Sequence, residues 1–447
     1  MSNPTTPHKS EGEVDHSDAF AKNEAFVRGN LVRNYIGHFL HGVFGMTGFR
    51  LISTPTFVPS YLYSVSGSEL WVGVGSSLQQ LGAVVSPILG AAFIEHRLRV
   101  LRIAAWLGMA MRLPLLGLAF AAWLLTGIPE LTAALILLFL FGIFSGPQRV
   151  AFQLLLAKVI PLAARGRLQA WRNLVGGIIA AAVSYFAGSW LIANEVLGNG
   201  YGTTFFLAFC LTSLGLLAIQ LILREPEAYA VRERTQLSQR FRELPSLVMS
   251  DSDFAWFILA RSLAIGTRIG LPFLFLYATQ ALELSVAEGA SDFGATIAVL
   301  SLAFMGAETF ANLLWGYLSD RTGFRLAFVL SLILNIIGMS LFLISDSYTA
   351  LVIGFALVGA AQAGYLMASF NLVLELGSLE DTSMRLALIS TAENVMGVVT
   401  PLLGAALTVW VGYEGTFLVT IGFLVMSLFV LMLKVKEPRR RTSYSVR

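Results

Sequence analysis

The chain has 447 residues, of which 56% are hydrophobic and 13% are charged, and its formal net charge is +3. Soluble globular domains carry about 25% charged residues, so this composition excludes a soluble protein and indicates one that crosses a membrane several times. Because the chain has a single cysteine, Cys210, it cannot form an internal disulfide.

The first 33 residues mix Lys, Asp, Glu and His without the apolar core of a signal peptide, so we expect a flexible cytoplasmic tail over 1–33. Twelve apolar segments follow. Each is long enough, at about 1.5 Å per residue, to cross a hydrocarbon layer of about 30 Å as a helix, and none alternates as a strand does. The predicted transmembrane helices are 34–62, 70–94, 100–125, 131–157, 168–193, 203–223, 253–280, 293–318, 325–344, 348–374, 386–411 and 414–433.

The connections between these segments are short except at 224–252, which is polar and Arg-rich and is able to form an amphipathic helix at the membrane surface. We therefore predict an all-α polytopic membrane protein with six-helix bundles at 34–223 and 253–433 and a basic cytoplasmic tail at 434–447. The stretches ILGAAFIEHRLRV and GYLSDRTGFR occupy corresponding places in the two halves, which indicates that the bundles are pseudo-symmetric repeats.

Lysine and arginine are distributed unevenly along the chain. If the N-terminus is cytoplasmic, 25 of these 30 residues lie on the cytoplasmic side, five lie inside predicted helices, and the opposite loops contain none. Since cationic loops remain in the cytoplasm, this distribution predicts that both termini are cytoplasmic.

The decapeptide GYLSDRTGFR at 316–325 is a charged stretch between two apolar segments. Its glycines allow the backbone angles of a tight turn, and an acid beside a helix N-terminus gains about 0.3–1 kcal/mol from the amide dipoles. We expect a cytoplasmic turn whose arginines anchor at the anionic leaflet. It serves either as a topological anchor or as a latch, with the acid pairing with a neighbouring helix end in one of two conformations.

The spacing Gly-x-x-x-Asp-Arg-x-Gly-x-Arg in this stretch resembles the loop motif of the major facilitator superfamily. With the twelve helices, the long central loop and the repeated half, the resemblance covers nearly the whole chain. It implies a multi-pass secondary transporter of the cell membrane in which two bundles rock about a midplane site. The fifth predicted helix contains no Pro, so the Gly-Pro motif of many drug antiporters in the family is absent. The candidate latch residues are Gly316, Asp320, Arg321, Gly323, Arg325 and, at the corresponding place in the first half, Glu95.

Five arginines lie inside predicted helices, against two acids at mid-span, Glu308 and Glu393. An arginine at mid-span costs roughly 2.5–3.5 kcal/mol even on the gentlest insertion scale, so each needs water, an acid or a ligand. Guanidinium groups hold carboxylates and phosphates in bidentate fashion and keep their charge. The excess of positive charge predicts an anionic substrate.

The resemblance implies a central cavity lined by the first, fourth, seventh and tenth helices. The alternative role for each arginine is structural: it pairs with Glu308 or Glu393 and so links two helices. For Arg112 we prefer such a pairing, or a side chain that extends toward the membrane interface. Arg261 and Arg268 are seven residues apart, which predicts that they share a face of the seventh helix. The candidate substrate-binding residues are Arg50, Arg149, Arg261, Arg268 and Gln362.

Four residues are candidates for proton coupling. Glu308 and Glu393 are the better ones, because an apolar bundle favours the protonated form of a carboxyl unless an arginine pairs with it. His38 and His41 share a face of the first helix, and the alternative is that they are packing residues.

We predict a transporter of a small, anionic or amphipathic organic solute, coupled to protons, rather than an enzyme. An aromatic-rich stretch at 49–64 favours an amphipathic solute unless its rings serve only packing. The alternatives are a transporter-like membrane sensor or scaffold and a lipid-modifying membrane enzyme; the scattered histidines form no metal or catalytic cluster. We expect no cofactor, no metal and no nucleic acid, and a monomer whose partners are its small-molecule substrate and the lipid bilayer. The chain contains no GxxxxGK[ST] loop for ATP.

Overall fold

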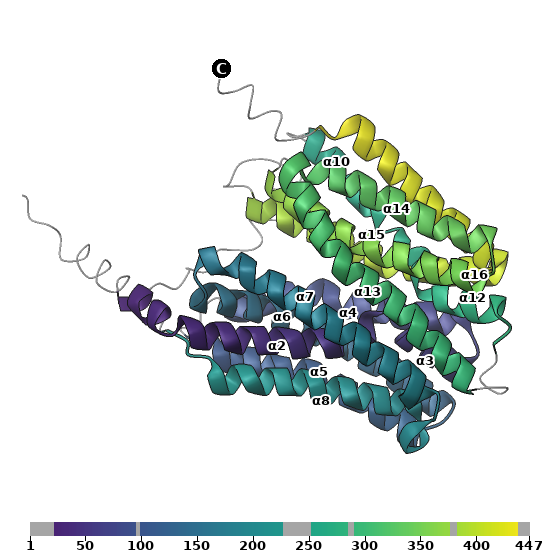
Figure 1. The fold of residues 1–447 in the computed structure, drawn as a ribbon, viewed down its shortest axis with the longest axis horizontal. Coiled ribbons are helices and arrows are strands. Elements are labelled where there is room, and N and C mark those ends of the chain that lie inside the picture. Colours follow the sequence, from purple (N-terminus) through teal and green to yellow (C-terminus); the bar gives the residue numbers. More distant parts are fainter. Residues whose placement is uncertain (1–21, 95–98, 227–251, 285–289, 376–381, 437–447) are drawn as a thin grey trace, which may run out of the picture.

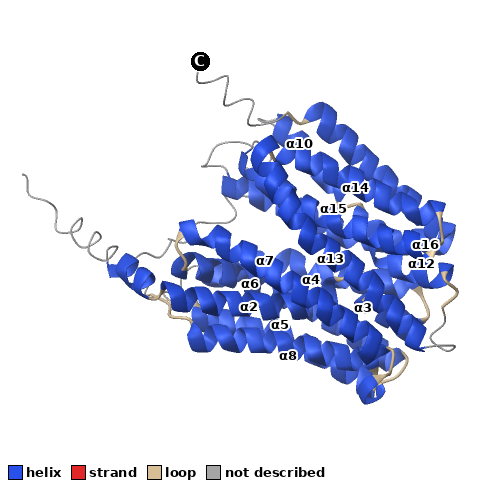
Figure 2. Cartoon of the chain, viewed as in Figure 1, coloured by secondary structure: helices blue, strands red, loops and turns tan. Residues whose placement is uncertain are grey.

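The computed structural model describes residues 22–94, 99–226, 252–284, 290–375 and 382–436. Within these ranges the chain forms helices joined by turns, and no strand occurs in them (Figure 2). The helices run roughly side by side as two groups, α2 to α8 and α10 to α16 (Figure 1).

The first group begins with α2, and residues 22–29 before it are also helical. A π-helical turn, η1, extends α7, and a short 3-10 turn, η2, leads into α8. The elements are α2 (Leu31–Ser53), α3 (Phe57–Ser66), α4 (Glu69–Ile94), α5 (Leu101–Leu124), α6 (Ile128–Val159), α7 (Leu162–Phe186), η1 (Ala187–Ile192), η2 (Val196–Gly198) and α8 (Gly200–Ile222).

The second group begins with a helix that is broken into pieces, α10 to α12. Its elements are α10 (Ser252–Ala264), α11 (Thr267–Gly270), η3 (Leu271–Phe273), α12 (Leu274–Ala281), α13 (Ala290–Thr322), α14 (Phe324–Ile344), α15 (Tyr348–Glu375) and α16 (Thr382–Lys434). Each apolar segment predicted from the sequence coincides with one of these helices or with a run of helical pieces.

The first apolar segment is two helices rather than one. Residue 54, between α2 and α3, is extended, with φ −68° and ψ 150°. The cause is the following Pro55, whose ring disfavours helical angles in the residue before it. Near the other end of the chain, α16 is interrupted by Gly412, at φ 75°, which separates the two segments predicted at 386–411 and 414–433.

The predicted boundary of the N-terminal tail is too late. Helix α2 already includes residues 31–33, and Arg33 donates hydrogen bonds to the carbonyl oxygens of Ile222 and Leu221 at the end of α8 (2.5 and 3.3 Å). The chain therefore joins the first bundle before residue 34. Residues 1–21, most of the predicted linker (227–251) and 437–447 lie outside the described residues.

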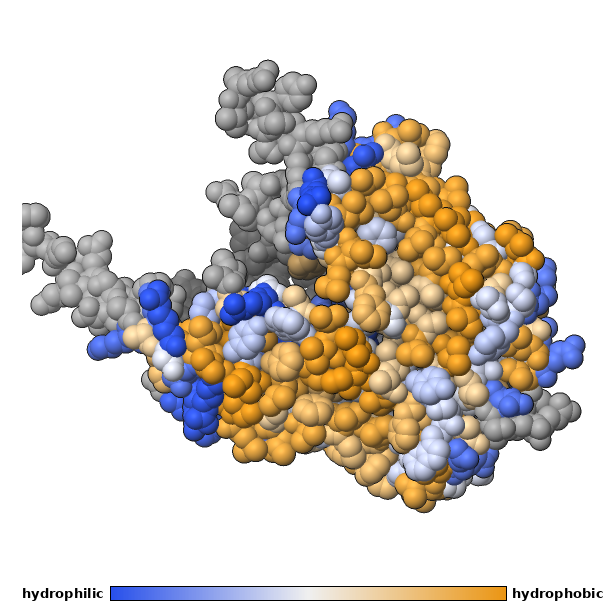
Figure 3. Space-filling view, in the orientation of Figure 1, coloured by the Kyte–Doolittle hydropathy of each residue, from blue (hydrophilic) through white to orange (hydrophobic). Residues whose placement is uncertain are grey.

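Nine helical stretches in the described ranges are long and apolar enough to cross a membrane, with 392–434 counted as one. Figure 3 shows apolar residues over the middle of the visible face and hydrophilic residues gathered toward its two ends. The apolar band is the surface that a bilayer would cover.

The two groups of helices meet across the middle of the molecule and at the end where α3 and α12 lie (Figure 1). There the Tyr413 hydroxyl donates to the Glu69 carboxylate at 2.9 Å, and Thr56 and Ser301 share a hydrogen bond of 2.8 Å. The backbones also touch, because a Cβ added to Gly188 would lie 2.6 Å from the Ala298 nitrogen. At the opposite end, where the described chain begins and ends, the two groups of helices splay apart.

Candidate functional site

Arg50 bridges the two bundles. From α2 it donates to the Glu308 carboxylate on α13 (3.1 Å) and to the Thr309 hydroxyl (3.0 Å), and the side chains of Arg50 and Glu308 are only 13% and 15% exposed. The first half offers Arg50 no acid within its predicted helices, but the second half does. In this conformation Arg50 acts as a strut between the bundles.

Arg261 is held by a second carboxylate. It pairs with Glu393 on α16 and donates to the Ser369 carbonyl oxygen of α15 at 3.1 Å. The Tyr365 hydroxyl donates to the same Glu393 carboxylate at 3.0 Å. This buried group ties α10, α15 and α16 together, and sequence spacing gave no sign of Tyr365 as a member.

Arg149 and Arg268 differ from these two arginines, and we call them the inter-bundle arginines. Neither makes a hydrogen bond or ion pair with any other residue that the structure describes. Arg149 lies on α6, yet its charge interacts with those of Arg268 and Glu393 on the other bundle. A Cβ on Gly397 would lie 2.6 Å from an Arg268 guanidinium nitrogen, so Arg268 packs against α16. The inter-bundle arginines thus lie near each other between the bundles, two positive charges beside one carboxylate that Arg261 already occupies.

The prediction that Arg261 and Arg268 share a face of one continuous helix is wrong, because they do not lie on one helix. The helix is interrupted at 265–266, so Arg261 lies on α10 and Arg268 on the separate piece α11. Both nevertheless act electrostatically on Tyr365. Gln362, one turn before Tyr365 on α15, is half-buried and makes no hydrogen bond with another described residue.

A further cationic cluster lies inside the first bundle. Arg112 is fully buried, donates only to the Gly108 carbonyl oxygen (2.5 Å) and lies over the Phe49 ring, with two guanidinium nitrogens unpaired. The expected pairing with Glu308 or Glu393, or reach toward the interface, is therefore wrong. Arg172, counted from the sequence as a cytoplasmic cation, lies within α7 against the backbone of Gly42.

His38 and His41 belong to this cluster and not to the inter-bundle space. Both are buried, with their Nε2 atoms unpaired, and His41 stacks on Phe152 with the ring centroids 4.3 Å apart. The charges of Arg112 and Arg172 act on His41. Packing is the role that these contacts support for the two histidines.

The charged decapeptide is mostly helix. Gly316 lies inside α13, which continues to residue 322, so only Gly323, at φ 92°, makes the turn. Arg325 donates to the carbonyl oxygens of residues 431 and 432 at the end of α16 (3.3 and 2.8 Å) rather than reaching toward lipid. Arg321 stacks on the Tyr317 ring, and Asp320 is exposed and makes an interaction of its own. Glu95 lies outside the described residues.

No group of three His, Cys, Asp or Glu residues that could hold a metal ion occurs in the part of the chain that the structure describes. The charged groups that the structure places between and within the bundles are arginines and the carboxylates of Glu308 and Glu393. This arrangement suits recognition of a charged solute.

The chain resembles known proteins along nearly its whole length. The family model for the Major Facilitator Superfamily matches residues 290–447. The multidrug resistance protein MdtG of Escherichia coli strain K12 / DH10B is 26% identical over 415 residues, which cover 89% of this chain and 92% of the relative, and MdtG of strain SE11 matches equally.

Solved transporter structures share the fold. A mutant of the nucleoside transporter NupG gives a TM-score of 0.70 at 15% identity, covering 91% of this chain and 99% of that one. A D-xylose-proton symporter gives 0.67 at 13% identity, covering 92% and 99%. The human organic anion transporter MFSD10 gives 0.59 at 16% identity, covering 90% and 99%.

An all-helical chain of this composition, with charged groups between two bundles, belongs to the class of multi-pass membrane transporters. The match of residues 290–447 to the Major Facilitator Superfamily model, together with the relatives and the shared fold, supports a secondary transporter similar to that superfamily and a multi-pass protein of the inner membrane. The chain's curated relatives are named for multidrug resistance although the predicted fifth helix contains no Pro.

Proposed function

We propose that the protein transports an amphipathic organic anion by alternating access between two six-helix bundles, in exchange or symport with protons. The observation that carries the proposal is the pair of inter-bundle arginines. They lie between the two bundles, where Arg149 is exposed and Arg268 is partly buried, and they make no hydrogen bond with a described residue. Two guanidinium groups that cannot lose their protons favour a carboxylate, sulfonate or phosphate between them.

The proposal includes twelve membrane spans with both termini in the cytoplasm. The cation count supports this orientation, and so does the fact that the described chain begins and ends at the same end of the molecule (Figure 1). On this orientation the Glu69–Tyr413 contact closes the outer side. The splayed helices at the other end then correspond to an inward-facing state. The proposal keeps bundle boundaries near residues 223 and 253.

The amphipathic character of the solute is supported by relatives rather than by the aromatic stretch. The curated relatives are named for multidrug resistance, and one structural neighbour is titled an organic anion transporter. Phe57 and Tyr61, in the aromatic stretch, are buried in the core of the first bundle, where Tyr61 contacts Tyr201 and Phe205. These rings serve packing, which was the alternative left open by the sequence.

The test is counterflow of labelled solutes into proteoliposomes, with amphipathic anions, neutral analogues and cations compared side by side. Removing one partner from a desolvated charge pair costs about 2–5 kcal/mol, so Arg149→Gln and Arg268→Gln should each raise the KM for anions by about thirtyfold or more. Lys at either position keeps the charge but loses the bidentate geometry and should fall between. Anion uptake by both Gln variants at the parental KM would overturn the anionic substrate. Binding without counterflow would favour the sensor.

Proton coupling is proposed to run through Glu308. Its carboxylate holds Arg50 across the bundle interface, so protonation would release the strut and ease separation of the bundles. Glu393 is held by two donors, Arg261 and Tyr365, within one bundle, and is the weaker candidate. The buried histidines lie in a different place and do not contact either acid in the described structure.

A further inference from the structure

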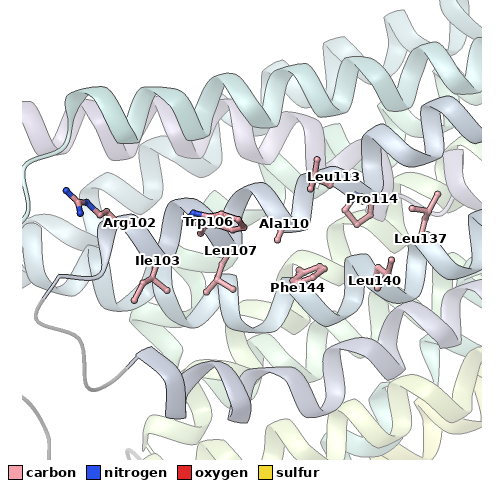
Figure 4. Close-up of a pocket in the computed structure, with 10 residues that line it drawn as sticks. All are labelled: Arg102, Ile103, Trp106, Leu107, Ala110, Leu113, Pro114, Leu137, Leu140 and Phe144. Atoms are coloured by element: carbon pink, nitrogen blue, oxygen red, sulfur yellow. The ribbon is translucent and has the colours of Figure 1, made fainter.

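A long groove runs along the outer side of the first bundle between α5 and α6, and we call it the α5–α6 groove (Figure 4). Its volume is about 780 Å³. Its walls are apolar side chains, among them Leu107, Leu140 and Phe144, and among the described residues that line it the charged one is Arg102, at one end. It is separate from the charged groups between the bundles.

The groove faces the surface that a bilayer covers. On α5, Trp106 is 80% exposed and Leu113 is 53% exposed, and both line it. The small Ala110 of α5 lines the groove between these two residues, and at the far end lies Leu137, which packs closely against Gly117. An apolar hollow on this surface fills with a hydrocarbon chain rather than with water.

The length of the groove matches one leaflet. From Arg102 to Pro114 is twelve residues of helix, or about 18 Å at 1.5 Å per residue, and half of a hydrocarbon core of about 30 Å is about 15 Å. An acyl chain whose headgroup lies beside Arg102 would therefore extend along the groove to about the level of the bilayer midplane.

Arg102 supplies the charge that selects the headgroup. It lies in the first turn of α5, its side chain is exposed, and it has no hydrogen bond or ion pair with another described residue. The start of α5 lies at the end where the described chain begins, because the Glu225 carboxylate accepts from the backbone nitrogens of residues 100 and 101 while the Arg224 nitrogen donates to Asn34 near the start of α2. A guanidinium at this level attracts anionic phospholipid headgroups.

We propose that the α5–α6 groove is a binding site for an anionic phospholipid of the leaflet on the Arg102 side, with one acyl chain in the groove and the headgroup phosphate on Arg102. The site is independent of the transported solute. The bound lipid would contact α6, the helix that also carries Arg149.

The experiment uses the full-length protein reconstituted in vesicles of phosphatidylcholine with or without phosphatidylglycerol, extracted in mild detergent, with retained lipid counted by native mass spectrometry. The parent should retain phosphatidylglycerol in preference to phosphatidylcholine. Arg102→Gln should reduce that preference about fivefold, the effect of one cation at the anionic surface. Ala110→Phe, or Ala110→Leu if the larger ring impairs folding, should abolish retention of both lipids.

Two matched variants provide the controls. Met109→Phe adds a ring to an exposed position of α5 that does not line the groove, and Arg167→Gln removes an exposed cation from α7. Both should retain lipid as the parent does. Equal retention by Ala110→Phe and the parent, or equal loss in Arg167→Gln and Arg102→Gln, would overturn the site.

Discussion

Arg112 and Arg261 are both buried arginines, but their surroundings differ in a way that decides their effect on stability. Arg261 has a carboxylate and a carbonyl oxygen as partners. Arg112 has one carbonyl oxygen and an aromatic face, and two of its nitrogens are unpaired. A buried charge without a counter-charge opposes folding, whereas a paired charge resists removal because its partner is left alone.

The first prediction compares these two residues. Arg261→Met should lower the stability of the purified protein by about 3–5 kcal/mol, because it leaves Glu393 without its charged partner. Arg112→Met, which replaces the charged guanidinium by a shorter, unbranched apolar side chain, should raise the melting temperature in detergent. If both variants lose stability equally, a counter-ion or ordered water must neutralise Arg112.

The second prediction concerns Glu308. Glu308→Gln cannot release or bind a proton, so it should retain solute counterflow but lose the acceleration by an imposed pH gradient. Glu393→Gln serves as the comparison, because its carboxylate lies inside one bundle. Gradient-driven uptake that persists in Glu308→Gln would assign the proton to another group.

At the scale of elements, the ends of α13 and α14 show what the charged decapeptide does. The turn depends on a single residue, Gly323, whose φ of 92° is open only to glycine without strain. Gly316, although part of the same sequence motif, lies in regular helix with no atom within 4 Å of where a Cβ would be. Arg325 then ties the start of α14 to the end of α16.

The third prediction follows from this difference between the two glycines. Gly323→Ala should destabilise the protein by about 1–3 kcal/mol, the range for a strained backbone position. Gly316→Ala should stabilise it by about 0.5–1 kcal/mol, because alanine loses less backbone entropy in a helix. Thermal unfolding of both purified variants is the measurement. Destabilisation by Gly316→Ala would mean that this glycine is needed for a close approach in another conformation.

At the scale of the whole molecule, the two bundles touch through backbone at one end. Gly188 on η1 and Gly294 on α13 approach so closely that a Cβ on Gly294 would lie 2.5 Å from the Gly188 carbonyl oxygen. Together with the Glu69–Tyr413 hydrogen bond, this contact closes that end. In alternating access the same surface has to open, so a side chain here biases the equilibrium between the two states.

The fourth prediction tests that equilibrium. Gly188→Leu should favour the state that is open at this end and raise the labelling of Ser301→Cys by an impermeant maleimide about tenfold, which corresponds to a shift of about 1.4 kcal/mol. Ser301 is fully buried here, and the exposed Cys210 is first replaced by Ser. Gly422→Leu, at an exposed position with no atom within 4 Å, is the control. Unchanged labelling in Gly188→Leu would mean that this contact does not gate the outer side.

The helices themselves follow from local sequence. Apolar runs without alternation can satisfy their backbone in a membrane only as helices, and the interruptions at Pro55 and Gly412 follow from the backbone limits of proline and glycine. The excess of buried cations over acids is also visible in the sequence. Two predictions from local sequence were wrong. Gly316 was expected in a turn but lies inside α13, and Arg261 and Arg268 were expected on one helix but lie on two pieces. A sequence motif does not specify where a helix ends.

Which arginine is paired was decided only by tertiary structure. Arg50 meets Glu308 across 258 positions of sequence, and Arg261 meets Glu393 across 132, while Arg149 and Arg268 have no such partner among the described residues. The sequence alone determined that charges would lie within apolar segments and that the positive ones would be in excess. The packing of the helices against one another determined the partner of each arginine, because side chains distant along the chain interact only after the bundles have brought them within hydrogen-bonding range.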